Sequence, residues 1–385
     1  MSVTTPSGFT AQGAAAGFKS TGARDLALVV NNGPLDVAAA VFTANRAKAA
    51  PVLFSERVVA DGRARAVVLN SGGANCFTGE QGSSVTERTA QLTAEAIGAE
   101  SRDVVVCSTG LIGEQLPVER FEAAVPALAA ELADTDAAGI AAAEAIMTTD
   151  TVPKTAVYRG AGWSVGGMAK GAGMLAPGLA TMLVVLTTDA VADAAELDAA
   201  LRASTRVTFD RLDSDGCMST NDTVVLLASG ASDQTPGSAA LQEAVTAVCA
   251  DLARQLLHDA EGASHDIEIE VVGAVSEDEA VEVGRSCARS NLLMTAIFGN
   301  DPNWGRVLAA IGTTSASFDP YDVDVTFNGV RLCTKGGPDR PREECDLTPR
   351  RTHILIDLHA GERAATILTN DLTHDYVHEN SAYSS

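Results

Sequence analysis

The segment Lys170–Thr188 reads KGAGMLAPGLATMLVVLTT and joins a glycine-rich loop to a strongly apolar run. Three glycines and one proline in the loop permit or fix backbone angles that most residues avoid. Residues 181–188, TMLVVLTT, are rich in β-branched side chains and predict a strand. Thr181 therefore stands where the loop enters the strand, and the small Ala180 before it leaves its own carbonyl open to approach.

This junction suits self-cleavage. A threonine hydroxyl at a strained turn can attack the preceding carbonyl and shift the acyl group from nitrogen to oxygen. Hydrolysis of the ester then frees an N-terminal threonine, whose α-amine has an unperturbed pKa of roughly 7.7–8.0 and can serve as base for its own hydroxyl. Without further information, such a loop is more often only a turn, so the junction alone does not decide between the two readings.

Helical and strand patterns alternate on both sides of this junction and predict a layered α/β protein with a structural boundary near 265–275. We expect strands at 103–108 and 223–230, a capped helix at 84–98 and a long helix at 238–261 that ends with Glu261. Residues 160–162 mark the turn of a hairpin. Further strands are expected near 293–298, 322–328, 353–359 and 363–369.

Bulk composition excludes several classes of protein. The 385 residues carry a formal charge of −23, with no Lys/Arg run to offset it, which disfavours nucleic-acid binding. No apolar stretch is long enough to span a membrane, and the first residues lack the pattern of a secretory signal. Seven cysteines without a CxxC pair and six unclustered histidines indicate neither disulfides nor a metal site. We therefore expect a cytoplasmic protein without a metal.

Several blocks of sequence resemble the ornithine acetyltransferases, also called glutamate N-acetyltransferases, in the order found in that family. The blocks are AKGAGMLAPGLATML around the junction, NSGGANCFTG (70–79), CSTGLIGEQLP (107–117), AIMTTDTVPK (145–154), TFDRLDSDGCMSTNDT (208–223), DAEGA (259–263), GNDPNWGRVLAAIG (299–312) and HENSAYSS (378–385). One departure is the doubled glycine Gly72–Gly73 with Cys76, where the family reads closer to NSGNANA. The resemblance implies an αββα sandwich with a smaller C-terminal α/β domain.

It also implies cleavage between Ala180 and Thr181 into an α chain, 1–180, and a β chain, 181–385, which assemble as an oligomer of αβ heterodimers. Thr181 would be the nucleophile, and Thr109 with Gly110 would form the oxyanion hole.

The implied substrate ligands lie in several of these blocks. They are Thr148 (with Thr149 as an alternative), Lys170, Thr181, Glu261, Asn380 and Ser385. Lys170 would meet a substrate carboxylate and Glu261 the δ-ammonium of ornithine. Because chain ends usually fray, the C-terminal ligands require an anchored tail, for which Tyr376 and Tyr383 are candidates.

The resemblance implies transfer of acetyl from N2-acetyl-L-ornithine to L-glutamate in arginine biosynthesis, with no cofactor. It leaves open whether acetyl-CoA is a second acetyl donor, and whether the chain serves arginine synthesis or a related specialised pathway. A self-cleaving aminopeptidase or amidase, which passes the acyl group to water, is the alternative enzyme. A binding protein with neither cleavage nor turnover is the alternative outside catalysis.

Overall fold

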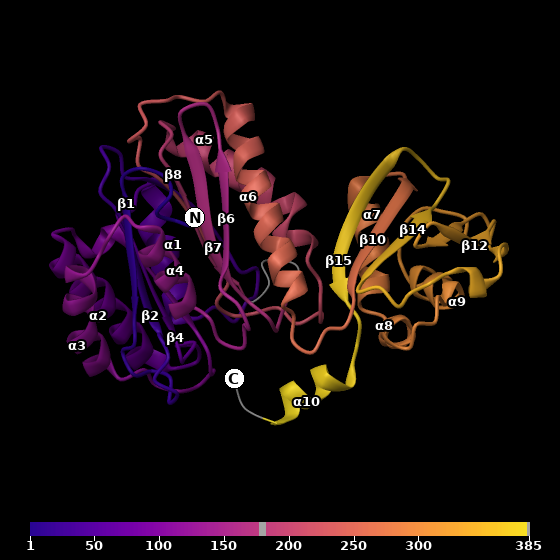
Figure 1. The fold of residues 1–385 in the computed structure, drawn as a ribbon, viewed down its shortest axis with the longest axis horizontal. Coiled ribbons are helices and arrows are strands. Elements are labelled where there is room, and N and C mark those ends of the chain that lie inside the picture. Colours follow the sequence, from indigo (N-terminus) through magenta and orange to yellow (C-terminus); the bar gives the residue numbers. More distant parts are fainter. Residues whose placement is uncertain (177–181, 383–385) are drawn as a thin grey trace.

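The computed structural model describes residues 1–176 and 182–382. The predicted cleavage bond between Ala180 and Thr181, and the predicted ligand Ser385, lie outside the described residues. Two sheets form the larger part of the molecule, and a third sheet forms a smaller part beside them (Figure 1).

The first sheet has the strand order β1-β2-β4-β5. Its strands are β1 (Phe9–Ala14), β2 (Leu26–Asn31), β4 (Ala66–Ser71) and β5 (Val104–Thr109). The helices near it are α1 (Ala50–Val58), α2 (Gly79–Ile97), α3 (Val118–Ala130) and α4 (Asp136–Ala145). Figure 1 shows α2 and α3 on the outer side of this sheet.

The second sheet has the strand order β3-β9-β8-β7-β6. Its strands are β3 (Val37–Phe42), β6 (Lys154–Arg159), β7 (Ser164–Lys170), β8 (Leu183–Thr188) and β9 (Thr223–Ala228). Helices α5 (Ala194–Val207) and α6 (Ser238–His258) pack on its outer face. Parallel pairing joins β8 to β9, while β7 and β8 run antiparallel.

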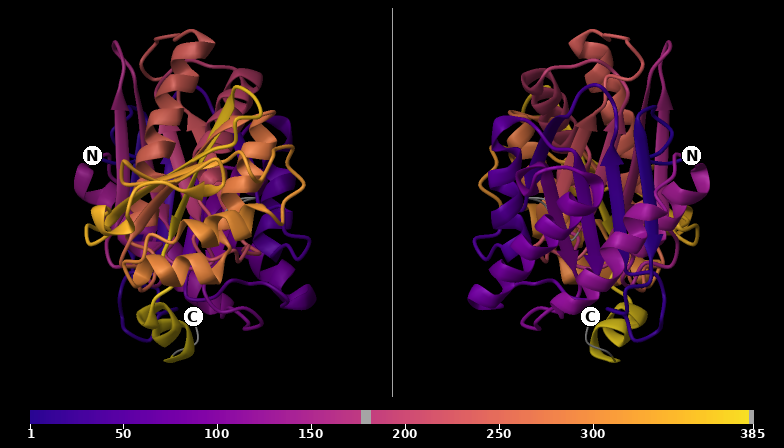
Figure 2. Two further views of the ribbon diagram at one scale, coloured as in Figure 1. Left: turned by 90° about the vertical axis from the view of Figure 1, so that its right-hand side faces the viewer. Right: turned by 90° about the vertical axis from the view of Figure 1, so that its left-hand side faces the viewer.

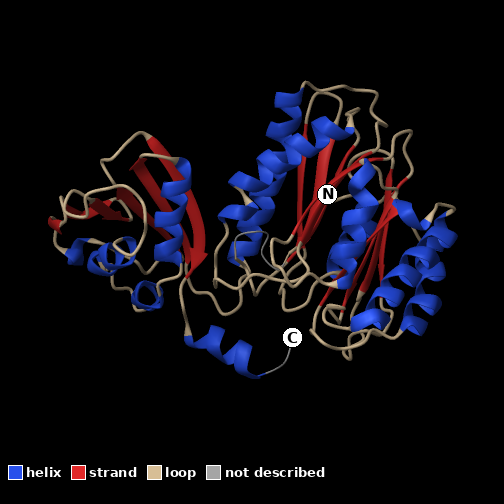
Figure 3. Cartoon of the chain, turned by 180° about the vertical axis from the view of Figure 1, so that it is seen from behind, coloured by secondary structure: helices blue, strands red, loops and turns tan. Residues whose placement is uncertain are grey.

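Alternating side chains explain why these sheets stack in four layers. Val29 and Leu69 point from the first sheet into a cluster that also contains Val185 and Val225 of the second. The neighbouring side chain Leu28 belongs instead to the cluster under α2 and α3. Successive strand residues face opposite sides, so strands buried on both faces read as continuous apolar runs. The result is an αββα sandwich, seen from behind in Figure 3.

The third sheet has the order β13-β12-β11-β14-β10-β15 and its own apolar core. Its strands are β10 (Asp266–Ala274), β11 (Asp324–Phe327), β12 (Val330–Thr334), β13 (Gly337–Pro338), β14 (Arg351–Asp357) and β15 (Arg363–Asn370). Helices α7 (Glu277–Ala288), α8 (Asn291–Phe298) and α9 (Trp304–Ile311) contribute to that core. The division of the chain into 1–180 and 181–385, with a boundary near 265–275, stays a prediction.

The last helix, α10 (His374–Ala382), stands apart from the third sheet and lies below the sandwich in Figures 1 and 2. Within the described residues, no helix combines the length and the apolar character needed to cross a membrane.

Three expectations about local structure were wrong. Residues 293–298 belong to helix α8, whose N-cap is the Ser290 hydroxyl, because a short apolar run does not separate strand from helix. Helix α2 begins at Gly79 rather than Ser84, and the Ser84 hydroxyl donates to a backbone carbonyl inside the helix. Helix α6 ends at His258, so Glu261 lies in the following turn and not at a helix terminus.

Candidate active site

The turn after β5 carries the predicted oxyanion pair. The Thr109 carbonyl accepts the amides of Gly72 and Gly73 at 2.8 and 2.9 Å. Gly110 has φ +128°, and a Cβ there would lie 2.5 Å from the Gly73 nitrogen. A side chain at position 110 would therefore clash with backbone in a conformation that L residues rarely adopt. The doubled glycine that departs from the family pattern is the segment that packs against this turn.

Lys170, the last residue of β7, reaches across the sandwich to this turn. Its Nζ donates to the Thr109 hydroxyl oxygen at 3.2 Å, although the two residues belong to different sheets. A hydroxyl that accepts one hydrogen bond still has its own hydrogen to donate. The Thr109 hydroxyl therefore keeps a hydrogen that it can donate, and its role in an oxyanion hole stays a prediction. The Lys170 side chain is buried, with 2% of its surface exposed.

Nearby carboxylates act electrostatically on the buried Lys170 ammonium. Burial lowers the pKa of Lys170, Asp150 counteracts this, and the nearby Lys154 lowers it further. Burial alone would raise the pKa of Asp150, yet Lys170, Lys154 and the Gly171 amide hold it below its usual value. Lys154 is bound by Asp150 at 2.6 Å and by Asp259 at 2.5 Å. Buried charges need such partners, so these two carboxylates fix the Lys154 ammonium in place.

Glu261 connects the tail to the rest of the site. Its carboxylate accepts the Thr149 hydroxyl at 2.7 Å and the Asn380 amide at 2.9 Å. Glu261 also influences the pKa of Lys170, so the two charges act on one another. The structure therefore brings Glu261 and Asn380 together, and the contact with Glu261 is made by Thr149 rather than Thr148.

The tail itself is held at Gly262. The Thr373 hydroxyl donates to the Gly262 carbonyl at 2.6 Å, and the Tyr376 amide donates to the Thr373 hydroxyl at 3.0 Å. A Cβ at Gly262 would lie 2.2 Å from the Tyr376 nitrogen, which shows how closely the segments approach. Tyr376 thus belongs to the anchored segment, whereas Tyr383 lies outside the described residues.

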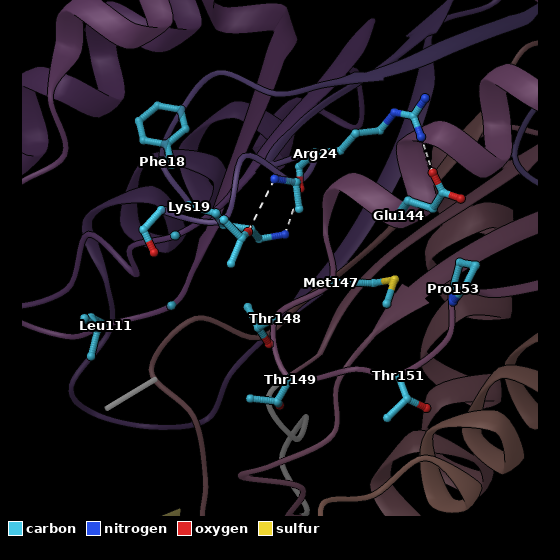
Figure 4. A pocket seen from close by; sticks show the side chains of 15 residues that line it. Phe18, Lys19, Arg24, Leu111, Glu144, Met147, Thr148, Thr149, Thr151 and Pro153 are labelled. Carbon is cyan, nitrogen blue, oxygen red and sulfur yellow. Dashed lines mark hydrogen bonds and ion pairs between the residues drawn. The ribbon is translucent and has the colours of Figure 1, made fainter. Parts of the chain in front are cut away.

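Two pockets meet at this site. One, of about 830 Å³, is lined by Gly72, Gly110, Leu111 and Thr148, together with Phe18, Lys19 and Arg24 (Figure 4). The other, of about 810 Å³, is lined by Glu261, Asp259 and residues of α10. Thr149 and Thr151 line both pockets. We call the first the Lys19 pocket and the second the Glu261 pocket.

The described chain resumes at Met182, the residue after Thr181. The Met182 amide donates to Asp222 Oδ1 at 3.1 Å, and Leu183 pairs with Lys170 on one side and Thr223 on the other. Asp222 is fully buried, and burial raises its pKa well above the usual value. Its Oδ2 atom has no hydrogen-bond partner in the part of the chain that the structure describes.

Sequence reasoning missed Asp150, Lys154, Asp222 and Lys19 as members of the site. Asp150, Lys154 and Asp222 lie inside blocks that resemble the family, so those blocks contained the signal. Asp150 and Lys154 pair with one another locally, but their bonds to Gly171 and Asp259 join distant segments. Lys19 lies outside every one of those blocks.

The stacked sheets and the buried lysine beside a Thr–Gly turn define a layered α/β enzyme. The chain belongs to the ArgJ family, which matches residues 10–385. It is 62% identical to the arginine biosynthesis bifunctional protein ArgJ of Streptomyces avermitilis and 61% identical to that of Streptomyces coelicolor, over the full length of each chain.

Among solved structures, an ornithine acetyltransferase complexed with ornithine from Mycobacterium tuberculosis is 49% identical, with a TM-score of 0.45. The match covers 47% of this chain and 96% of that one. The family membership and fold class predicted from the sequence are confirmed, while the roles of individual site residues stay predictions.

Proposed function

We propose that this chain transfers the acetyl group of N2-acetyl-L-ornithine to L-glutamate in arginine biosynthesis. The full-length relatives share a name that places them in that pathway. The observation that carries the chemistry is the Lys170–Thr109 hydrogen bond beside Gly110, which joins a buried cation to a turn suited to an oxyanion.

The first proposed step prepares the nucleophile. The Thr181 hydroxyl attacks the Ala180 carbonyl, and the C–N bond between these residues breaks as the new ester forms. Water hydrolyses that ester, which leaves Ala180 with a carboxylate and Thr181 with a free α-amine. The α-amine and the hydroxyl then act as base and nucleophile within one residue.

The second proposed step moves the acetyl group. The Thr181 hydroxyl attacks the acetyl carbonyl of acetylornithine, and its proton passes to the α-amine. Thr109 and Gly110 donate hydrogen bonds to the resulting oxyanion, which is commonly a large contribution to catalysis. The C–N bond to ornithine breaks, and ornithine leaves with the proton. The amine of glutamate then attacks the acetyl ester, so the kinetics are ping-pong.

Charge pairing supports these substrates. Acetylornithine carries a carboxylate and a δ-ammonium, which Lys170 and Glu261 complement. Glutamate shares the carboxylate but lacks the ammonium. Thr148, Asn380 and Ser385 complete the proposed set of ligands, with Thr149 as the alternative to Thr148.

The bifunctional activity named in the relatives fits a second acetyl donor, and we propose acetyl-CoA as a co-substrate that acetylates glutamate. No resident cofactor takes part in the proposed steps. We also propose that the α and β chains stay together as a cytoplasmic oligomer of αβ heterodimers.

Transfer to water is the rival reaction. Purified enzyme would be given acetyl-labelled acetylornithine with and without glutamate, and ornithine, acetate and acetylglutamate would be quantified. A parallel reaction with acetyl-CoA would record CoA release. We expect labelled acetylglutamate in proportion to ornithine. Formation of acetate at the same rate with and without glutamate would instead identify a hydrolase.

A further inference from the structure

A buried carboxylate shapes the loop between β1 and β2. Asp25, which is fully buried, accepts the backbone amide of Ala16 at 2.5 Å and that of Lys19 at 2.8 Å. The Lys19 ammonium turns back to donate to the Arg24 carbonyl at 2.8 Å. These bonds hold the loop so that Lys19 lines the Lys19 pocket, above Thr148 in the view of Figure 4.

The charge of Lys19 lacks an ion-pair partner. Over residues 1–176 and 182–382, no carboxylate lies within 4.0 Å of its ammonium, whereas Arg24 on the same wall is paired with Glu144. An ammonium has three hydrogens to donate, and the one bond to Arg24 leaves capacity for a ligand. An unpaired, half-buried cation is notable in a chain with a formal charge of −23.

Lys19 also lies within electrostatic reach of the reaction site. Burial lowers its pKa, Asp25 and Asp150 oppose that shift, and Lys170 adds to it. The Lys170 ammonium donates to Thr109, the residue before Gly110, and Gly110 lines the same pocket as Lys19. The site therefore holds two cations without an ion-pair partner among the described residues, Lys19 and Lys170.

We propose that Lys19 binds the side-chain carboxylate of the acceptor amino acid. This inference rests on the proposed function, in which Lys170 binds the carboxylate common to both substrates. Glutamate has two carboxylates for these two cations, whereas acetylornithine has one carboxylate and one ammonium. The shared carboxylate of donor and acceptor thus binds Lys170. The δ-ammonium of the donor binds Glu261, and the side-chain carboxylate of the acceptor binds Lys19.

The phosphates of acetyl-CoA are another anion that a lysine could bind. They lie a full pantetheine arm away from the thioester carbon, however, whereas the side-chain carboxylate of glutamate is only a few bonds from the attacking amine. Lys19 lines the same pocket as Gly110 and Thr148, and this proximity matches the shorter distance. The glutamate carboxylate is therefore the ligand that we assign.

The test compares glutamate with glutamine, its uncharged isostere, as acceptors of acetyl from acetylornithine. Lys19→Gln keeps a donor for the Arg24 carbonyl but removes the charge. The ratio of kcat/KM for glutamate to that for glutamine should fall about 10- to 100-fold, as expected for loss of a partly buried charge pair. Lys19→Arg should retain most of the ratio. Arg24→Gln, which removes a charge already paired with Glu144, is the matched control and should change the ratio less than about threefold.

Several results would overturn the assignment. An unchanged ratio in Lys19→Gln, or an equal fall in Arg24→Gln, would remove Lys19 from acceptor recognition. A rise in the KM for acetyl-CoA with an unchanged ratio would assign the pocket to that donor instead. Lys19→Met decides the same question if Lys19→Gln does not fold. Failure of the wild-type enzyme to transfer acetyl from acetylornithine to any amino acid would instead refute the proposed function.

Discussion

Replacing Glu261 with glutamine removes one charge from the proposed ornithine site while keeping the shape of the side chain. The Glu261 carboxylate accepts two hydrogen bonds, from Thr149 and Asn380. Truncating one partner of a buried charged pair commonly costs about 2–5 kcal/mol, and Glu261 is only partly buried. We therefore expect the lower part of that range, so the KM for acetylornithine should rise about 30- to 100-fold.

The KM for glutamate should change much less, because glutamate has no side-chain ammonium. Initial rates with each substrate varied in turn would measure both values. N2-acetylnorvaline, a donor that lacks the ammonium, should be nearly insensitive to Glu261→Gln.

A glutamine amide would also face the Asn380 amide and weaken the attachment of α10. Asn380→Ala removes that attachment without removing the charge, and we expect it to affect both substrates alike. Equal effects of Glu261→Gln on acetylornithine and glutamate would refute the charge-pairing argument.

Three further changes test other parts of the site. Thr109→Ala should lower kcat about 10²–10³-fold in the processed enzyme. Thr109→Ser, which keeps the hydroxyl, is the control. A change in kcat below about threefold in Thr109→Ala would exclude Thr109 from the oxyanion hole. Asp150→Asn removes a negative charge that offsets the positive charges of Lys154 and Lys170. Thermal unfolding should therefore show a free energy of unfolding about 3–5 kcal/mol lower near neutral pH. Because the folded pKa of Asp150 is depressed, its carboxylate stabilises the fold fully above the unfolded pKa of about 3.9. This stabilisation is lost as the pH falls through the folded pKa. A difference in the free energy of unfolding between wild type and variant that stays constant down to acid pH would contradict this. Since burial lowers the pKa of Lys170 below 10.5, the KM values of both substrates should rise at alkaline pH as the ammonium loses its proton, and Lys170→Met should show high KM values at every pH.

Much of the fold follows from local patterns. The apolar run after the junction predicts β8, the two glycines in 160–162 mark the turn between β6 and β7, and the strand expected at 223–230 is β9. The short run at 293–298 misleads because leucine and isoleucine suit both a buried strand and a buried helix. The Ser290 hydroxyl caps the first turn of α8 and so favours the helix.

The site was predictable only where the family blocks carry it. Thr109 and Lys170 were expected in one site, and the hydrogen bond between their sheets joins them. Glu261 was expected at a helix end but lies in a turn, because α6 stops three residues earlier. Asp150 bonds locally to Lys154 but also to the distant Gly171 amide, a contact that no local pattern encodes. Asp25 and Arg24 hold the Lys19 loop locally, but the place of Lys19 beside Gly110 depends on how distant segments pack.

The central claim is that Thr181 cuts the chain before itself and then carries the acetyl group. Denaturing mass spectrometry of the purified wild-type protein should show two fragments, 1–180 and 181–385, that remain associated under native conditions. Thr181→Ala should give one intact chain without transferase activity, whereas Thr187→Val, a control six residues further along the chain, should still be cut. A Thr181→Ala variant cut at the same bond, or a fully active wild-type protein that stays intact, would contradict the account.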